Sequence, residues 1–120
     1  MVIPLYGKWD SFFNGYFHVM SQEVASDGKI HLLKINALDF SDYLDYADLA
    51  ETFGGRSICV AGGYLWTAEE HGGDGEKLYR RSLTTLVADW SSTPLGAGVP
   101  PIDSIVTDGT YIYCFGVLCR

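Results

Sequence analysis

Positive charge is scarce in this 120-residue sequence: eight lysines and arginines stand against fifteen aspartates and glutamates, which gives a net charge of −7. A protein that binds nucleic acid must neutralise phosphates, so this balance excludes that class of partner. Long apolar runs are also missing, because none approaches the ~18 residues that a helix needs to cross a bilayer. The opening segment, MVIPLYGKWD, lacks the charged, apolar and cleavage regions of a signal peptide. We therefore expect a soluble protein with no nucleic-acid partner and no membrane span.

Cysteine is rare as well. The three cysteines are Cys59, Cys114 and Cys119, and no two of them form a C-x-x-C pair. An odd, small number without such a pair argues against a disulfide framework and against a closed zinc site. Cys59 and Cys114 lie in the alternating apolar runs SICVA and YIYCFG, where a free cysteine behaves as a small hydrophobic residue. This usage favours a reducing, intracellular environment, although the compartment itself stays unknown.

Sequence signatures of catalysis are missing too. The chain has no G-x-S-x-G, no H-E-x-x-H, no P-loop and no dinucleotide fingerprint. His71 stands near Glu69, Glu70 and Asp74 and offers the groups of a base or a ligand, but its loop, EEHGGDGE, is typical of an exposed hairpin tip. We expect no enzyme activity, no catalytic residue and no cofactor.

An acid-rich stretch is the most conspicuous charge feature, with acidic residues at every third position: Asp39, Asp42, Asp45, Asp48 and Glu51. Carboxylates gathered on one side of a helix or loop offer oxygens to Ca²⁺. The stretch lacks the D-x-D-x-D-G pattern of a calcium loop, and aromatic and leucine residues are interleaved with the acids. We interpret it as a packed outer edge with a solvated acidic face, helix or strand, and expect no metal site.

A repeat of about 47 residues is the strongest signal in the chain. Each copy begins with serine and an apolar pair, passes through a turn that contains glycine, and resumes with tyrosine, an apolar residue and another ring. Tyr16, Tyr64 and Tyr111 are 48 and 47 residues apart. Three segments share the pattern: residues 11–19, 57–67 and 104–114.

One copy of the repeat contains the signals of two hairpins. Its first turn holds a dipeptide that reaches positive φ at little cost: Asn14-Gly15, Gly62-Gly63 or Asp108-Gly109. In the first two copies another turn precedes a strand-like run, residues 29–35 and 77–83, where Ile35 aligns with Leu83. A fourth, poorer strand is expected near residues 44–49 and 90–94. Four short antiparallel strands in ~45 residues are typical of one blade of a β-propeller.

The chain resembles the β-propeller superfamily, in its spacing and in the rhythm GxYIY … DGxxLYR of short-bladed members. The Gly-His and Trp-Asp pairs of WD40 blades and the sialidase Asp box are absent. The Trp-Asp-Ser-Phe start and the period are similar to tachylectin-like lectin propellers, although the later copies lack that motif. The resemblance implies a closed ring of about four to eight blades, and no binding residue carries over.

We therefore predict an all-β fold, a partial propeller of antiparallel four-stranded blades within a single repeat domain, residues 1–120. Its parts are a closing strand or linker (1–10), blade 1 (11–56), blade 2 (57–103) and half of blade 3 (104–120). Two and a half blades leave apolar faces and edges open. Either the chain assembles with itself, most simply as a dimer of five or six blades, or it supplies part of a larger propeller.

Three functions fit such a ring. The first is a non-enzymatic structural or interaction protein, a rigid platform for protein contacts in a virion or another large assembly. The second is a carbohydrate-binding module, with sugars stacked on the rings that recur in the three copies: His18, Trp66 and Tyr113. The third is a fragment of a propeller hydrolase whose catalytic groups lie in other blades. For these three rings we favour packing between blades over sugar binding, because large side chains must fill the wedge between neighbouring sheets.

Overall fold

All regular structure in the described part of the chain is β-strand. The computed structural model describes residues 9–21, 27–47, 54–70, 76–92 and 102–116. Ten strands and no helix lie in these ranges, and all the strand pairings are antiparallel. The prediction of an all-β fold is confirmed. A helix long and apolar enough to span a membrane is likewise not found among these residues.

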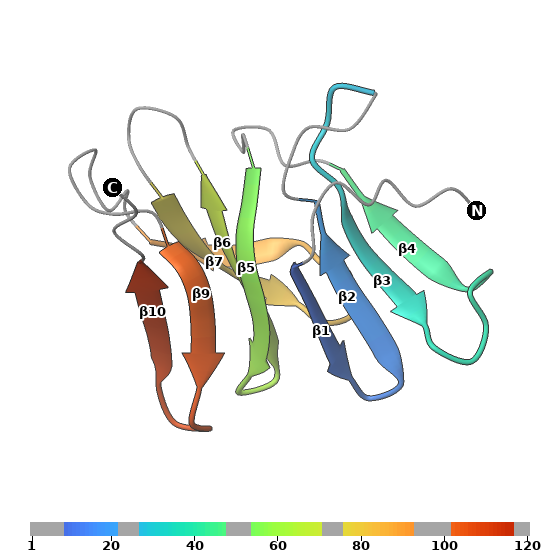
Figure 1. Cartoon of the computed structure of the whole chain (residues 1–120). Helices are drawn as coiled ribbons and strands as arrows, with labels where there is room; N and C mark the ends of the chain where they lie inside the picture. Colours follow the sequence, from blue (N-terminus) through green and yellow to red (C-terminus); the bar gives the residue numbers. More distant parts are fainter. Residues whose placement is uncertain (1–8, 22–26, 48–53, 71–75, 93–101, 117–120) are drawn as a thin grey trace.

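The strands form three sheets, in which each strand pairs with the next one along the chain (Figure 1). Sheet 1 contains β1 (Trp9–Phe13), β2 (Tyr16–Met20), β3 (Leu32–Asn36) and β4 (Tyr43–Tyr46). Sheet 2 contains β5 (Gly54–Ala61), β6 (Tyr64–Glu70), β7 (Glu76–Ser82) and β8 (Ala88–Ser91). Sheet 3 contains β9 (Ile102–Thr107) and β10 (Ile112–Gly116). The outer strands β4 and β8 thus begin slightly earlier than predicted, and most of the predicted closing segment 1–10, residues 1–8, lies outside the described residues.

Two of the three predicted tight hairpins have the backbone that their sequences favour. Asn14 and Gly15 have φ values of 52° and 83°, and Gly62 and Gly63 have 59° and 81°. Two central residues at positive φ are typical of the type I′ turn, whose twist matches that of the flanking strands. The third connection is wider, because Thr107 pairs with Ile112 and four residues lie between them.

Strand pairing revises part of the predicted repeat alignment. Ser11 pairs with His18, whereas the residue that pairs with Trp66 is Cys59 and not Ser57. The serine alignment of the first copy is therefore wrong by two residues, because Ser11 lies five residues before Tyr16 whereas Ser57 lies seven residues before Tyr64.

The predicted alignment of the third strands, β3 and β7, is also wrong by two residues. Ile35 pairs with Phe17, and the corresponding pair in sheet 2 is Arg81 with Leu65. Ile35 therefore corresponds to Arg81 and not to the predicted Leu83. The hairpin of the second and third strands is two residues shorter in the second copy, since the tyrosines are 48 residues apart but Asn36 and Ser82, which pair with them, are 46 apart.

The sheets stack face to face, and their first strands β1, β5 and β9 are neighbours (Figure 1). Between sheets 1 and 2, the core contains Met20 and Leu32 from one side and Ile58 and Leu65 from the other. Each such side chain stabilises the fold by about 1.5–3 kcal/mol when it is fully buried. Between sheets 2 and 3, a smaller core forms around Ala68 and Ile105.

Candidate functional site

The three predicted ring positions lie on one face of each sheet, which we call the ring face; the opposite face is the back face. His18, Trp66 and Tyr113 pair with Ser11, Cys59 and Val106 on the neighbouring strands, and successive residues of a strand point to opposite faces. The ring face of sheet 1 packs on the back face of sheet 2, and the ring face of sheet 2 packs on the back face of sheet 3.

The same strand position has a different environment in each sheet. The His18 side chain is buried, with 1% of the residue exposed, so a sugar has no open ring face to stack on. Trp66 is half-buried: its Nε1 donates to the Ala61 carbonyl at 3.1 Å, and its ring meets Trp90 edge-on with centroids 6.0 Å apart. His18 and Trp66 thus contribute to packing between sheets, and the structure does not bring the three rings together in one site.

Tyr113 is the exposed member of the three, at 43%. Its hydroxyl donates to Asp108 at 2.8 Å, and this hydrogen bond to a carboxylate raises the pKa of Tyr113. The same carboxylate accepts from the amide nitrogens of Thr110 and Tyr111, which fixes the wide loop of sheet 3. Tyr113 is therefore held rigidly on the ring face of sheet 3 with its ring in solvent.

Two apolar sheet faces have no described sheet packed against them. On the ring face of sheet 3, Tyr113 lies beside Val106, which is 44% exposed. On the back face of sheet 1, Phe12 is 59% exposed and packs against Phe17 with ring centroids 4.9 Å apart. Tyr43, from the outer strand of the same sheet, is 45% exposed. These faces are the two ends of the stack of sheets.

The back face of sheet 1 is only partly open. Leu33 and Ile35, from β3 on this face, are 3% and 5% exposed. The exposed apolar side chains of this face, Phe12 and Tyr43, lie on the two edge strands β1 and β4.

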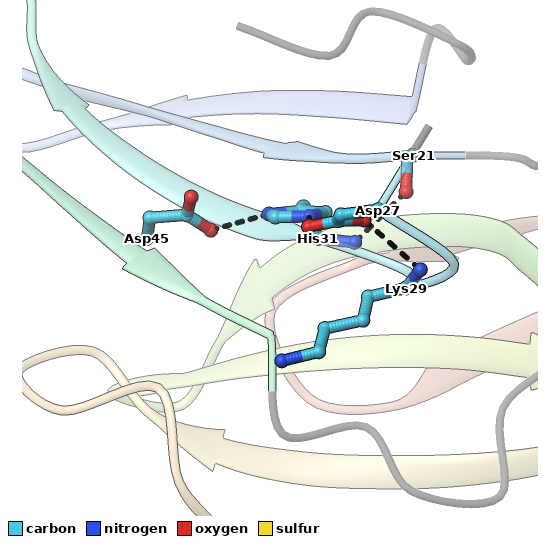
Figure 2. A network of polar contacts seen from close by, with 5 residues as sticks. All are labelled: Ser21, Asp27, Lys29, His31 and Asp45. Carbon is cyan, nitrogen blue, oxygen red and sulfur yellow. Dashed lines mark hydrogen bonds and ion pairs between the residues drawn. The ribbon is translucent and has the colours of Figure 1, made fainter. Parts of the chain in front are cut away.

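A charged cluster that the sequence analysis missed lies directly before β3, around His31 (Figure 2). The Nδ1 atom of His31 lies 2.7 Å from an Asp45 carboxylate oxygen, and its Nε2 atom lies 2.6 Å from an Asp27 oxygen. The backbone of His31 is bonded to Ser21, whose hydroxyl accepts from the His31 amide at 2.9 Å. The Lys29 amide donates to Asp27 at 3.0 Å. Two carboxylates, from the loop before β3 and from β4, therefore flank one imidazole.

The cluster favours the charged imidazole. Burial on its own lowers the pKa of His31, but the hydrogen bonds to Asp45 and Asp27 together raise this pKa by more than burial lowers it. The net shift of this pKa is upward. Burial also works against the Asp27 carboxylate, but the bonds from His31 and Lys29 bring the pKa of Asp27 below its usual value. With both ring nitrogens engaged, the imidazole is not placed to exchange a proton with a substrate, so its role here is to hold the loop.

The described carboxylates of the acid-rich stretch make hydrogen bonds to nearby residues. Asp39 accepts from the amide and hydroxyl of Ser41, Asp42 accepts from the Asn36 amide group, and Asp45 holds His31. The stretch includes the edge strand β4, which resolves the choice between helix and strand. Asp48 and Glu51 lie outside the described residues, as do His71, Asp74 and Cys119.

A buried ion pair lies between β6 and β7, on the back face of sheet 2. Arg81 donates to Glu69 at 2.9 Å, to the Thr67 hydroxyl at 3.2 Å and to the Leu86 carbonyl at 3.0 Å. Leu86 has a φ of 66°, which is unfavourable for a side chain that is not glycine, so the bond from Arg81 stabilises a strained turn. The ring of Tyr46, from sheet 1, covers the guanidinium at 5.7 Å. This network therefore joins the two large sheets.

Cys59 behaves as the sequence predicts for a packed thiol. It lies between sheets 2 and 3, where burial raises its pKa to about 11. The thiol is therefore protonated at neutral pH and is a poor nucleophile.

A cavity of about 140 Å³ opens between sheets 1 and 2, near the β1–β2 hairpin and the β7–β8 turn. Sheet 1 contributes Tyr16, His18 and Lys34 to its wall, and the β7–β8 turn contributes Leu83 and Thr84. The sequence signal for this site is Lys34, near the end of the strand-like run KIHLLKI. The cavity itself depends on how the sheets pack.

Comparison with known proteins adds no relative. The scan against protein-family models gave no match, and neither did the search of curated proteins.

Proposed function

We propose that the chain is a non-enzymatic interaction protein whose sheets are successive blades of a β-propeller, and that a second copy completes the ring. The observation that carries the proposal is the packing rule within the chain: the ring face of each sheet meets the back face of the next. One ring face, on sheet 3, and one back face, on sheet 1, have no described partner sheet.

The exposed residues of the two end faces support a second copy as the occupant. Phe12 and Phe17 pair with each other in sheet 1 as Val60 and Leu65 do in sheet 2, and Val60 and Leu65 belong to the core against sheet 1. The back face of sheet 1 thus offers the same kind of apolar pair as a back face that is already covered. Contact between unlike faces, repeated twice around a two-fold axis, closes a ring instead of extending a filament.

Light scattering with size-exclusion chromatography tests this proposal. We expect a mass of about twice 13.2 kDa. Val106→Asp and Phe12→Asp each place a charge on one end face, and each is expected to reduce the mass to that of one chain. Leu38→Glu is the matched control, because Leu38 is exposed on the β3–β4 turn, away from both faces, and this variant is expected to stay dimeric.

The other outcomes identify the alternatives. A folded wild-type monomer at high concentration overturns self-completion and favours a chain that forms part of a larger propeller. Species heavier than a dimer, whose mass grows with concentration, indicate that the contact extends a filament and does not close a ring of two copies. A dimer unaffected by Val106→Asp and Phe12→Asp contradicts the proposed faces.

Carbohydrate binding is the second candidate, and one observation favours it at a residue other than the three predicted. Trp90 is 45% exposed, and Arg80 beside it makes two hydrogen bonds to Asp89, at 2.8 and 3.2 Å. An open indole next to paired polar groups suits a sugar, which stacks its C–H face and bonds its hydroxyls. Glycan-array binding that Trp90→Ala abolishes supports this candidate, and no binding in the dimeric wild type eliminates it.

A further inference from the structure

The wall of the cavity between sheets 1 and 2 contains a lysine, Lys34, that has no acidic partner in the described part of the chain. The Nζ atom of Lys34 donates to the Leu83 carbonyl across the sheet interface at 2.7 Å and lies 4.5 Å from the centre of the Tyr16 ring. An ammonium group has three donors, so two remain for other acceptors. Among the residues that the structure describes, no carboxylate lies within ion-pair distance of Lys34.

Sheet 2 provides an internal comparison for this lysine. Lys34 pairs with Leu44 and Arg80 pairs with Trp90, so the two cations occupy the same position in their sheets. Arg80 also lies 4.5 Å from the centre of a tyrosine ring, that of Tyr64.

The difference between the two positions is the counter-ion. Arg80 makes two hydrogen bonds to Asp89, and this pairing lowers the pKa of Asp89. Asp89 immediately precedes Trp90, and the residue before Leu44 is Tyr43, which has no negative charge. The second sheet thus supplies its own anion, whereas the first sheet leaves the cation at the wall of a cavity.

The rest of the cavity wall also suits a negatively charged ligand. Asn14 and Thr84 have side-chain donors, and none of the lining residues within the described ranges is acidic. The volume of the cavity, about 140 Å³, is close to that of cavities of ~150 Å³ that hold benzene. A ligand of roughly six non-hydrogen atoms therefore fits.

We infer that this cavity is a binding site for a small oxyanion, either a phosphate or a short carboxylate. Lys34 supplies the charge, and Asn14, Thr84 and the Tyr16 hydroxyl supply neutral donors. The inference does not depend on the proposed assembly, because all of these residues belong to one chain and lie away from the two end faces.

NMR titration of ¹⁵N-labelled protein tests the site. Sodium phosphate and sodium acetate are added in separate experiments, each against sodium chloride at equal ionic strength, because added salt also screens the negative charge of the whole chain. We expect saturable shifts of the amides of residues 14–18, 34 and 83–84 with at least one of the two anions. Saturation by phosphate alone or by acetate alone identifies the class of ligand.

Three variants test which positive charge binds the anion. Lys34→Gln is expected to weaken binding at least tenfold, and Arg80→Gln, at the corresponding position of sheet 2, is expected to leave it within twofold of wild type. Lys34→Arg retains the charge and is expected to bind, which keeps the test valid if Lys34→Gln does not fold. Shifts that fail to saturate in the wild type, shifts no different from those with chloride, or equal losses in Lys34→Gln and Arg80→Gln overturn the inference.

Discussion

At Gly55 the backbones of the two larger sheets are in direct contact. Its amide donates to the Ser21 carbonyl at 3.1 Å, and a Cβ atom added at this position would lie 2.5 Å from that same oxygen and 2.8 Å from the Met20 side chain. A backbone oxygen cannot move aside as the end of a flexible side chain can. Only glycine therefore allows this approach between β5 and the end of β2.

We predict that Gly55→Ala lowers the free energy of unfolding by about 1–3 kcal/mol, the usual effect of overpacking. Urea denaturation followed by circular dichroism measures it. Thr110→Ala, in the exposed loop of sheet 3, is the control and is expected to stay within about 0.5 kcal/mol of wild type. A Gly55→Ala variant as stable as Thr110→Ala would show that the sheets can separate locally without loss.

His31 gives the fold a dependence on pH with a definite sign. Its pKa is raised above the ordinary 6.5, so its stabilisation is complete below pH 6.5 and is lost as the pH rises through the folded value. The pKa of Asp27 is lowered below 3.8, so its stabilisation is complete above pH 3.8 and is lost as the pH falls through the folded value. The cluster therefore stabilises the fold most between pH 3.8 and 6.5.

We predict that His31→Gln lowers the Tm by several degrees within this window and by much less at pH 9. Thermal unfolding across the pH range measures the difference from wild type at each pH. Thr110→Ala again serves as the control, and its Tm is expected to run parallel to that of wild type. A difference between His31→Gln and wild type that is constant with pH would mean that the imidazole acts through packing and not through its charge.

At the scale of the element, the sequence predicts what is local and misses what depends on register. Asn14-Gly15 and Gly62-Gly63 specify their turns by backbone preference alone, so both hairpins were predictable. The distance from the serine to the first turn and the length of the second hairpin each differ by two residues between the copies, and the turn signals do not reveal either difference. The contacts of His31 with Asp45 and of Arg81 with Glu69 depend on how the strands of each sheet align, so neither partner was predicted. Trp66 was placed on the correct strand, but its burial depends on the neighbouring sheet.

The ion pair between Glu69 on β6 and Arg81 on β7 affects the stability of the fold. Glu69 is fully buried, and its charge is balanced by Arg81. Removal of one partner of a buried pair typically costs about 3–5 kcal/mol, whereas replacement of both by apolar residues is often neutral. Ile35 occupies the position of Arg81 in sheet 1, so the repeat itself shows that an apolar residue is accepted there.

We predict that Glu69→Gln lowers the free energy of unfolding by about 3 kcal/mol, and that the double variant Glu69→Leu with Arg81→Ile loses less than this single variant. Urea denaturation of the wild type, Glu69→Gln, the single variants Glu69→Leu and Arg81→Ile, and their double variant forms the test. Independent additive losses would contradict a coupled pair.

At the scale of the whole molecule, the stack of sheets has apolar ends and a strongly negative surface. Phe12, Val106 and Tyr113 provide the attraction between copies in the proposed ring, and a net charge of −7 on each copy opposes their approach. Salt screens repulsion between exposed charges and leaves the burial of apolar area nearly unchanged. Association through these faces is therefore strengthened by salt.

We predict that the dissociation constant of the dimer falls severalfold when sodium chloride is raised from about 50 mM to about 500 mM, a range over which the screening length drops to less than half. Sedimentation equilibrium at both salt concentrations measures it. Leu38→Glu adds a negative charge away from the end faces, so its dimer is expected to be slightly weaker than wild type at low salt and equal to it at high salt. A dimer that dissociates as salt is added would instead rest on ion pairs, and the apolar end faces would not be the contact.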